Sequence, residues 1–430
     1  MVHDVIVVGA GFAGLSAALA LRDEGLDVLV LEARGRVGGR VEARADALGE
    51  WYDRGGQFLC EDMPEVMALV KRHAKTLVTT PIDGAFTLQP EMSEEDSQAL
   101  WDANVAIRDR MNAIDPTDPA VRDLSVWDWL QRQPDDVHAK SAFCSTVEGL
   151  WCQPIDAVPL WYLIDNDRRI TNEVSELQYF IAETMYALAA DLAADLGDRI
   201  RLTVPVREVR HDKNGVILMT AEGSFQARRL VIAVPPVMAN RIAFSPPLPA
   251  KLAKALGAWR SGMVIKMRLR YARAFWRDQG RNGMVLWRDI HGLFVCDTSR
   301  DDAHPALVVF IGGPLALQLR ALGDAALRAE VLARIAAALG PHILEPLDVV
   351  MRDWIDDPWS GGGYSDIVAD FSAQDAEAVL RAGMASIHFA SSELSLSFPG
   401  YVEGAIISGR AAAETVLEAF ERPLGLDPPA

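Results

Sequence analysis

The sequence predicts an α/β fold in which a discontinuous, Rossmann-like nucleotide-binding domain carries a second, mixed α+β domain. Three observations support this. The chain opens with a strand, a glycine-rich turn, a helix and a second strand; helical patterns dominate from about residue 62 to 190; and strand patterns return afterwards, with a helix at the end. Strand–helix segments at both ends favour one domain assembled from several pieces, with the other domain inserted between them.

The first elements form a β-α-β unit. Residues 4–8 are a β-branched run typical of a buried parallel strand, residues 15–25 a helix that Gly25 closes, and residues 27–33 a second strand. A turn-rich passage at residues 51–59 follows. In the helical middle, residues 93–111 begin with Ser93 and an acidic first turn, and residues 182–197 end at Gly197.

The second half returns to strands. Residues 200–236 contain strand patterns with a hairpin turn at residues 213–215, and the pattern predicts further strands at residues 262–271, 307–313 and 387–394 and helices at residues 325–340 and 402–420. We expect five segments. Residues 1–78, 190–256 and 357–430 build the nucleotide-binding domain, and residues 79–189 and 257–356 build the second domain.

Charge and cysteine content narrow the class of protein. The chain has 430 residues and a formal net charge of −18, which argues against nucleic acid or an anionic membrane as partner. No CxxC pair or metal-ligand cluster is present, and no apolar run reaches the roughly 18 residues that span a bilayer. The N-terminus lacks the basic start of a signal peptide. We expect a cytoplasmic protein without metal and with reduced thiols at Cys60, Cys144, Cys152 and Cys296.

The turn after the first strand is a dinucleotide-binding fingerprint. In "GAGFAG", Gly9 permits the tight turn, Gly11 lets backbone N–H groups approach a pyrophosphate, and Gly14 lets the helix pack closely on the strand. Glu32 ends the second strand, where a carboxylate accepts a hydrogen bond from a ribose hydroxyl. The full strand–turn–helix context favours a nucleotide site over an empty turn. Phe12 and Ala13, at the helix start, belong to that site.

A second glycine motif, "EARGRVGGR", follows the ribose carboxylate and is not needed for NAD. It resembles the FAD-binding motif of the glutathione-reductase-type flavoproteins. More narrowly, it resembles the "EAR-x-RVGGR" of the flavin-containing amine oxidase family, which includes monoamine oxidases, polyamine oxidases and histone lysine demethylases. The resemblance implies FAD as cofactor, bound in part by Ala33, Arg34, Gly38, Gly39 and Arg40.

The resemblance continues along nearly the whole chain, in the family's order. "DRGGQF" is similar to the family's Asp-x-Gly-Gly segment near the flavin, "PVREV" to the strand that grips the adenine, and "VIKM" to the strand with the family's lysine. "SGGGYS" and "FASSELSLSFPGYVEGAIISGRAA" are similar to the C-terminal signature that closes over the flavin ring. The matches assign to the cofactor Gly55, Gly56, Gln57, Val206, Trp354, Ser391, Ser392, Glu393, Gly400 and Val402.

Three positions depart from the family's pattern. Ser391 stands where the family has glycine near the ribityl chain, and "AETM" replaces a glycine pair ahead of the adenine strand. Gly363 stands where some members carry a cysteine that bonds covalently to the flavin. We therefore expect FAD to be bound non-covalently.

Three glycines precede a tyrosine in "DPWSGGGYS". Such a run indicates either a mobile loop or a close approach to the backbone. The resemblance implies that the backbone here runs along the flavin. It also implies that Tyr364 and Tyr401 flank the substrate amine in front of the ring, where aromatic faces attract positive charge. Without the resemblance, each would be interpreted as a half-buried packing residue.

Lys266 has two interpretations. Alternation along residues 262–271 places it on one face with Val264, Arg268 and Arg270, which by itself indicates a solvated basic face. The resemblance instead identifies Lys266 with the lysine that reaches flavin N5 through a water. It also identifies Trp354 with a tryptophan beside the flavin, for which simple core packing is the alternative.

These expectations describe a two-lobed, FAD-dependent amine oxidase with Lys266, Tyr364 and Tyr401 as catalytic residues. The neutral amine gives its α-hydrogen to flavin N5 and leaves an imine, which water hydrolyses, and O2 reoxidises the flavin to yield H2O2. The partners are a small amine and O2, and the chain is compatible with a homodimer. A flavoprotein with a structural flavin stays open. So does an L-amino-acid oxidase, whose carboxylate-binding arginine would be Arg168, Arg169 or Arg268.

Residues of the helical lobe indicate which class of amine to expect as substrate. The stretch "LWCQPIDAVPLWYLI" offers Trp151, Trp161 and Tyr162, which either line a cavity for a hydrophobic amine or form the core of that lobe. Carboxylates nearby keep a polyamine site open; they are Glu148, Asp156, Asp165 and Asp167. We expect a monoamine with an apolar or aromatic tail.

Overall fold

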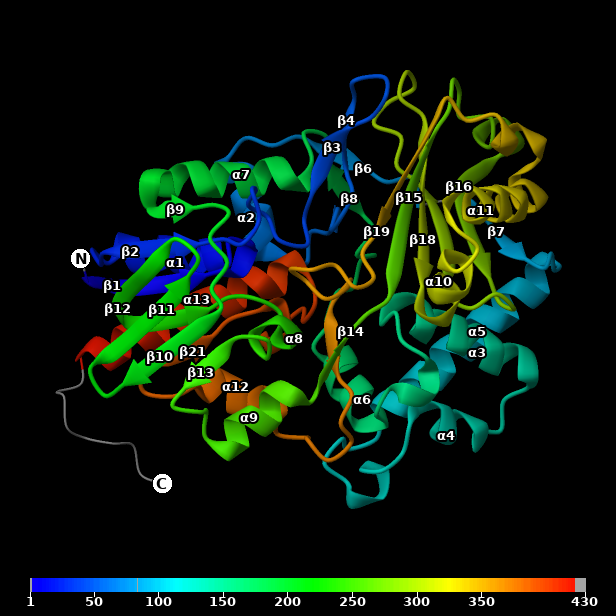
Figure 1. Ribbon diagram of the computed structural model, residues 1–430. Helices are drawn as coiled ribbons and strands as arrows, with labels where there is room; N and C mark the ends of the chain where they lie inside the picture. The colour runs from blue at the N-terminus through cyan, green and yellow to red at the C-terminus, as the bar shows by residue number, and fades with distance from the viewer. Residues whose placement is uncertain (1, 83, 422–430) are drawn as a thin grey trace.

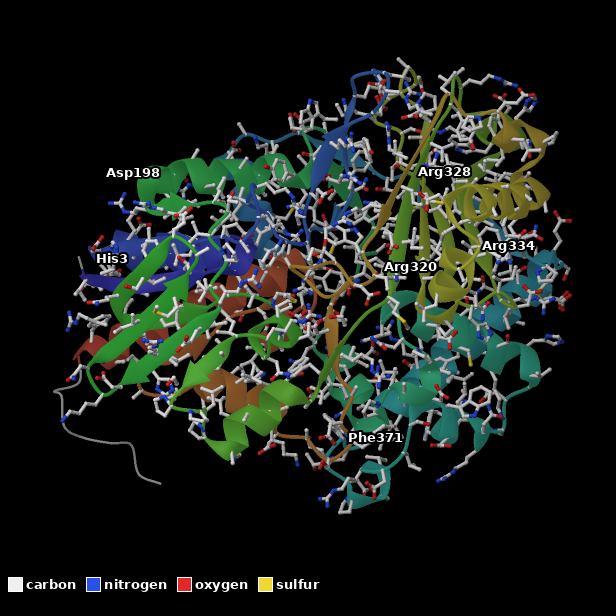
Figure 2. The ribbon with its side chains drawn as sticks, in the orientation of Figure 1. His3, Asp198, Arg320, Arg328, Arg334 and Phe371 are labelled. Carbon is white, nitrogen blue, oxygen red and sulfur yellow. The ribbon has the colours of Figure 1, made fainter. Side chains whose placement is uncertain are left out.

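The computed structural model describes residues 2–82 and 84–421. These residues form two lobes, and the chain passes from one lobe to the other several times (Figure 1). One lobe is built on an eight-stranded sheet and the other on a six-stranded sheet. Figure 2 shows the side chains of both lobes. His3 lies on the first strand, and Arg320, Arg328 and Arg334 lie on helices of the second lobe. The predicted α/β fold, with a Rossmann-like parallel sheet and a mixed second lobe, is confirmed.

The eight-stranded sheet has the order β13-β10-β11-β12-β1-β2-β9, with β21 also beside β12. Its neighbours β9, β2, β1, β12 and β21 pair in parallel, whereas β10, β11 and β12 pair antiparallel. The expected hairpin at residues 213–215 joins β10 to β11. The strands are β1 (Val2–Val8), β2 (Val28–Leu31), β9 (Ile200–Arg201), β10 (Glu208–Asp212), β11 (Gly215–Thr220), β12 (Gly223–Ile232), β13 (Ala243–Ser245) and β21 (Ile387–Phe389).

Helices cover both faces of this sheet, which explains the uninterrupted apolar run of β1. Val5 and Val7 belong to the core that α1, α2, α7 and α13 share, and Ile6 and Val8 belong to the core on the other face, with α9 and α12. The helices are α1 (Phe12–Asp23), α2 (Pro64–Arg72), α7 (Met185–Leu196), α8 (Pro236–Ala239), α9 (Ala250–Gly257), α12 (Ala376–Ala382) and α13 (Val402–Glu421).

The six-stranded sheet has the order β19-β15-β18-β17-β16-β7. Its strands are β7 (Ala85–Gln89), β15 (Val264–Arg270), β16 (Arg281–Trp287), β17 (Leu293–Asp297), β18 (Ala306–Gly312) and β19 (Asp348–Asp353). The helices of this lobe are α3 (Glu94–Asn112), α4 (Val126–Gln131), α5 (Val137–Leu150), α6 (Leu160–Arg168), α10 (Gly313–Arg320) and α11 (Asp324–Leu339). Ser93 caps α3 as expected, because its side chain accepts a hydrogen bond from Asp96 N.

Short elements complete the fold. The hairpin of β3 (Ala43–Ala45) and β4 (Trp51–Asp53) lies beside β15, and β14 (Trp259–Ser261) pairs with β20 (Asp366–Val368) where the chain crosses between lobes. A three-stranded sheet contains β5 (Phe58–Leu59), β6 (Leu77–Thr79) and β8 (Tyr179–Ile181). The 3-10 helices are η1 (Pro119–Val121), η2 (Ile155–Ala157), η3 (Gly197–Arg199), η4 (Arg277–Gln279), η5 (Pro341–Leu344) and η6 (Ser392–Leu394).

The structure corrects several predicted elements. The helical middle also contains β6, β7 and β8, and β7 joins the six-stranded sheet beside β16. Val206 lies before β10 and not within a strand, and the strand expected at residues 387–394 ends at Phe389. The expected boundary between residues 189 and 190 falls inside α7, which packs against α1. The division into five segments stays a prediction.

Candidate active site

The turn between β1 and α1 has the geometry that its glycines predict. Gly9 has φ +104°, and a Cβ atom there would lie 2.6 Å from the carbonyl oxygen that follows β12. A Cβ at Gly14 would overlap the Gly9 carbonyl oxygen, so only glycine allows α1 to pack this closely. Glu32, just beyond β2, accepts hydrogen bonds from Ala10 N (2.8 Å) and Arg34 N (2.7 Å). Burial raises the pKa of the Glu32 carboxyl, against the effect of these bonds.

The start of α1 is open to an anion. Gly11 caps the helix without a side-chain hydrogen bond. Within residues 2–82 and 84–421, the N–H groups of Phe12, Ala13 and Gly14 have no hydrogen-bond partner. Gly39 lies directly against Gly11, since a Cβ at Gly39 would be 3.4 Å from the Gly11 Cα. Unpaired N–H groups at a helix N-terminus, beside a backbone without side chains, fit the pyrophosphate of a dinucleotide.

Polar groups at the ends of other strands also lack partners. Ser391 follows β21, and its hydroxyl is buried without a hydrogen bond in the part of the chain that the structure describes. The backbone N–H and C=O groups of Val206, ahead of β10, make no hydrogen bond with any described residue. Buried polar groups are almost always satisfied, so the Ser391 hydroxyl indicates a bound partner. Val206 is partly buried, and its backbone groups are available to the same partner. Together with the donors at α1, they fit an FAD molecule lying across this sheet.

Arg40 connects motifs that are far apart in the sequence. Its guanidinium forms an ion pair with buried Glu393 and donates hydrogen bonds to Tyr364 O (3.0 Å) and Ser392 Oγ (3.1 Å). Glu393 also accepts a hydrogen bond from the N–H group of Asp366 (2.9 Å). The stretch from Ala33 to Arg40, with Gly38 and Gly39, therefore lies against the "SGGGYS" and "FASSEL" segments. One arginine holds three of the quoted motifs together.

Lys266 is buried against the Asp-x-Gly-Gly segment. Its ammonium group donates to Gly55 O (2.7 Å) and to Gln57 Oε1 (2.8 Å), and its side chain is 5% exposed. Gly56, between these two residues, packs on Val41. Burial lowers the pKa of the Lys266 ammonium, and the nearby Asp53 carboxylate opposes this shift. Two predicted site residues, Gly55 and Gln57, therefore contact the predicted lysine.

The interpretation of the Lys266 face as solvated and basic is wrong. The β3–β4 hairpin covers this face and supplies carboxylates to its arginines. Arg268 pairs with Asp46 (2.7 Å), and buried Arg270 pairs with Glu50 (3.0 Å). Alternation along one strand identifies which side chains share a face, but it does not show whether a distant hairpin covers that face.

Trp354 packs beside the "SGGGYS" loop. It is 3% exposed, its indole donates to Arg54 O (2.9 Å), and it shares a small apolar cluster with Cys152, Val264 and Tyr364. A Cβ at Gly363 would lie 3.7 Å from the Trp354 Cβ. Trp354, Gly363 and Tyr364 thus form one wall of the candidate site.

Packing within the protein requires glycine at two of the three positions of the glycine run. A Cβ at Gly361 would lie 2.5 Å from Ser261 Oγ, and a Cβ at Gly362 would overlap the carbonyl oxygen of Gly262. These two glycines let the loop pack on the crossing between β14 and β15. A contact between the backbone of this loop and the flavin stays a prediction.

Tyr364 stands at the edge of an aromatic cluster. Its ring meets Phe310 edge-on at a centroid distance of 5.7 Å, and Phe310 contacts Phe58 (6.2 Å) and Phe294 (6.1 Å). These rings come from β5, β17 and β18 and the loop before β20. Burial raises the pKa of the Tyr364 phenol well above its ordinary value, so the hydroxyl is neutral at physiological pH. The cluster forms an apolar surface beside the predicted catalytic tyrosine.

Tyr401 lies just before Val402, the first residue of α13, and its ring contacts Phe398 edge-on at 5.9 Å. Burial raises the pKa of its phenol as well. Gly400 approaches the tyrosine loop of the other motif, since a Cβ there would be 3.2 Å from Ser365 Oγ. The two C-terminal motifs therefore converge, and their tyrosines lie in the same region.

Sequence reasoning missed some residues and misplaced others. Trp151, Trp161 and Tyr162 lie in the main core and not at the tyrosines, as the core interpretation states. The aromatic cluster was not predicted, because pairing between strands is needed to bring Phe58, Phe294 and Phe310 together. Asp53 was quoted within a motif but not singled out. The "DRGG" context beside Gly55 was the signal that could have identified it.

Three further observations concern the cysteines, groups of metal-ligating side chains and membrane helices. All four cysteines are buried and free. Among the described residues there is no group of three or more His, Cys, Asp or Glu side chains that could hold a metal ion. No helix in that part of the chain is long and apolar enough to cross a bilayer.

Comparison with known proteins agrees with this geometry. An L-amino acid dehydrogenase of Synechocystis is 26% identical, over 96% of this chain and 94% of its own. The putrescine oxidase of Kocuria rosea is 30% identical, over 97% of this chain and 95% of its own. The structure of cyclohexylamine oxidase from Brevibacterium oxydans superposes with a TM-score of 0.88 at 26% identity, over 98% of this chain and 100% of its own.

The family comparison covers almost the entire chain. Residues 12–417 match the family described as flavin containing amine oxidoreductase. The match includes the strand with Lys266 and both C-terminal motifs, and the relatives above cover 96–98% of the chain. The chain therefore belongs to the flavin-containing amine oxidoreductase family and is a flavin-dependent enzyme.

Proposed function

We propose that the chain is an FAD-dependent oxidase of primary monoamines with an apolar or aromatic tail. The observation that carries the proposal is the aromatic cluster of Phe58, Phe294 and Phe310 beside Tyr364. Large rings favour an apolar tail over a second ammonium group, and the Lys266 ammonium, 5.5 Å from the centroid of the Phe310 ring, would repel a second positive charge there. The name of the similar cyclohexylamine oxidase is consistent with a substrate of this kind.

FAD would be held by the α1 N-terminus, the "RVGGR" turn, Val206 and the segment from Ser391 to Glu393. When bound, it supplies the acceptor for the amine's α-hydrogen and passes the electrons to O2, so that imine and H2O2 are the products. We propose that its attachment is non-covalent, because Gly363 offers no side chain where some family members carry the bonded cysteine.

The chain's own residues position the substrate. Tyr364 and Tyr401 are neutral phenols, and two aromatic faces confine the amine and attract what positive charge it develops. Burial lowers the pKa of Lys266, which eases exchange of a proton at its Nζ. The covered strand face and the apolar rings exclude bulk water from the reacting carbon.

The arginines suggested for an amino-acid substrate have other partners. Arg168 donates to the carbonyl of Ile114 (2.7 Å), and Arg169 pairs with Glu377 (2.8 Å). Arg268 pairs with Asp46. An α-carboxylate needs an arginine whose two donors face it, so these contacts weigh against an L-amino-acid oxidase.

Three of the four carboxylates suggested for a polyamine site have other partners. Glu148 accepts a hydrogen bond from Ile155 N (3.1 Å), and Asp156 is exposed. Asp165 pairs with Arg169 (2.9 Å), and buried Asp167 pairs with Arg108 (2.7 Å). At Asp165 or Asp167 a second ammonium group would have to displace Arg169 or Arg108, which supports the monoamine.

A substrate panel tests the proposal. We expect phenylethylamine and cyclohexylamine to give kcat/KM values at least about tenfold above those of putrescine, spermidine and L-phenylalanine. Phe310→Ala should lower kcat/KM for phenylethylamine by about 10- to 100-fold. The control, Phe86→Ala, removes an exposed ring from β7 and should have little effect. The monoamine proposal fails if spermidine or the amino acid is preferred tenfold.

A further inference from the structure

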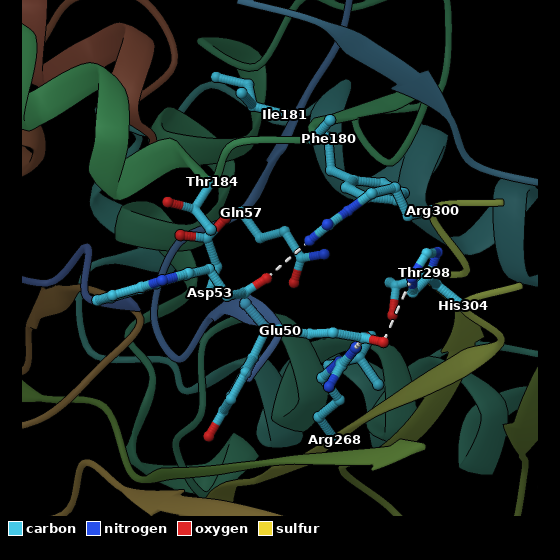
Figure 3. Close-up of a pocket in the computed structure, with 14 residues that line it drawn as sticks. Glu50, Asp53, Gln57, Phe180, Ile181, Thr184, Arg268, Thr298, Arg300 and His304 are labelled. Carbon is cyan, nitrogen blue, oxygen red and sulfur yellow. Dashed lines mark hydrogen bonds and ion pairs between the residues drawn. The ribbon is translucent and has the colours of Figure 1, made fainter. Parts of the chain in front are cut away.

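Two small cavities share Asp53. One has a volume of about 30 Å³ and is lined by Asp53 and Gln57 together with half-exposed Arg300 and His304 (Figure 3). The other has a volume of about 10 Å³ and is lined by Asp53 and Lys266. A buried water needs roughly 10–15 Å³ and two or more polar partners. The first cavity therefore has room for about two waters and the second for about one.

Both cavities leave room for water beside one carboxylate. Asp53 is 6% exposed, and its oxygens accept hydrogen bonds from Met185 N (2.8 Å) and Tyr186 N (3.3 Å). A carboxylate has lone-pair sites for about four hydrogen bonds, so it can also accept from a water in each cavity. Gln57 lines the larger cavity and accepts from Lys266 Nζ, which gives a second polar connection.

The charges around the pair favour exchange of a proton. Burial raises the pKa of the Asp53 carboxyl and lowers that of the Lys266 ammonium, and each shift is opposed by the charge of the other group. Arg300 also faces Asp53, and Arg268 and Cys296 face Lys266. These shifts bring the free energy of the charged Asp53–Lys266 pair closer to that of the neutral pair. A group that carries protons needs such a small difference, because it must both gain and lose a proton.

We propose that Asp53 and the waters of these two cavities form a proton path between Lys266 and the protein surface. Reduction of O2 to H2O2 takes two electrons and two protons. The cofactor gives up both electrons and one proton, so one proton must come from solvent. It would enter beside Arg300 and His304, pass to Asp53, and reach Lys266 Nζ through the smaller cavity. The proposal rests on the proposed function in taking O2 as the oxidant.

The alternative role for Asp53 is structural, because it accepts two N–H groups at the start of α7. Asn at this position keeps one oxygen acceptor but has no titratable proton. Asp53→Asn therefore removes the path while keeping part of the hydrogen bonding to Met185 N and Tyr186 N. Val350→Leu provides a second test, since Val350 lines the smaller cavity. The larger side chain should displace its water and leave both Asp53 and Lys266 in place. Asp297→Asn, at a buried carboxylate that lines neither cavity, is the matched control.

The kinetic test uses photoreduced holoenzyme mixed with oxygenated buffer, so it needs no amine and does not depend on the substrate assignment. We expect Asp53→Asn and Val350→Leu to slow reoxidation by at least about tenfold and to increase its solvent deuterium isotope effect. Asp297→Asn should reoxidise like the wild type. The proposal is overturned if both path variants stay within about twofold of the wild type, or if only Asp53→Asn is slow.

A second readout is independent of turnover. In holoenzyme with 13C-labelled lysine, the Lys266 signal is assigned by its absence in Lys266→Met and titrated by NMR. Asp53→Asn should lower the pKa of Lys266 by at least about one unit, because it removes the facing negative charge. Val350→Leu should leave that pKa unchanged. An unaltered Lys266 titration in Asp53→Asn would show that the two groups are not coupled and would contradict the path.

Discussion

Gly362→Ala is expected to be the most damaging substitution in the "SGGG" loop. The added Cβ would overlap the carbonyl oxygen of Gly262 and lie 2.9 Å from Ser261 Cβ. Two hydrogen bonds hold the same segments together, from Gly363 N to Gly262 O (3.0 Å) and from Gly262 N to Ser365 O (3.0 Å). The backbones must therefore separate. Overpacking costs about 1–3 kcal/mol, and we expect at least the upper value, because backbone and not a flexible side chain is in the way.

The substitution should also reduce activity, because the loop carries Tyr364 two residues later. A displacement of about 1 Å in a positioned group lowers the rate by about 100-fold. The assays are the midpoint of urea unfolding, followed by tryptophan fluorescence, and kcat/KM for the preferred amine.

Two glycines provide controls for Gly362→Ala. Gly363→Ala should destabilise less, because its Cβ meets a side-chain methyl of Val264 at 3.2 Å. Gly257→Ala should be neutral, because nothing lies within 4 Å of its Cβ. If Gly362→Ala matched Gly257→Ala in both assays, the packing explanation of the glycine run would be refuted.

Three further predictions concern the cofactor, the lysine and acid stability. Acid precipitation should release all FAD into the supernatant, and yellow colour kept in the pellet would show covalent attachment instead. Lys266→Met should retain FAD but slow amine-driven reduction or reoxidation by at least about tenfold; rates within about twofold would assign Lys266 a purely structural role. Burial disfavours the charge of Asp357, but its bonds to Arg34 (2.5 Å) and Arg352 (2.5 Å) outweigh this and lower its pKa. Asp357 therefore stabilises the fold above an unfolded pKa of about 3.9 and loses this effect as the pH falls through its folded pKa, so Asp357→Asn should flatten the decline of Tm in that acid range. An unchanged acid profile would contradict this.

The N-terminal half of the nucleotide site was predictable because its signals are local. Gly9, Gly14 and Glu32 lie within one β-α-β unit, where spacing along the chain determines spacing in the structure. The same holds for Ser93 at the start of α3, whose cap involves a residue three positions later. In such cases the residue types alone specify the backbone conformation.

The remainder of the site depends on contacts between distant segments. The burial of Lys266 requires the segment just after β4, more than two hundred positions earlier, and Arg40 reaches Glu393 near the other end of the chain. The aromatic cluster needs β5, β17 and β18 to be adjacent, which periodicity within one strand does not encode. For Lys266, Tyr364 and Tyr401 only the resemblance to a family supplied the prediction, and their catalytic roles stay predictions.

The central claim is that the flavin of this chain oxidises an amine. The most direct measurement is to mix the oxidised holoenzyme anaerobically with phenylethylamine and follow the visible absorbance of the flavin. We predict that the yellow colour is lost, that one equivalent of aldehyde and ammonia appears, and that admitting O2 restores the colour with formation of H2O2. A flavin that dithionite bleaches but that no monoamine, polyamine or amino acid reduces would contradict the account.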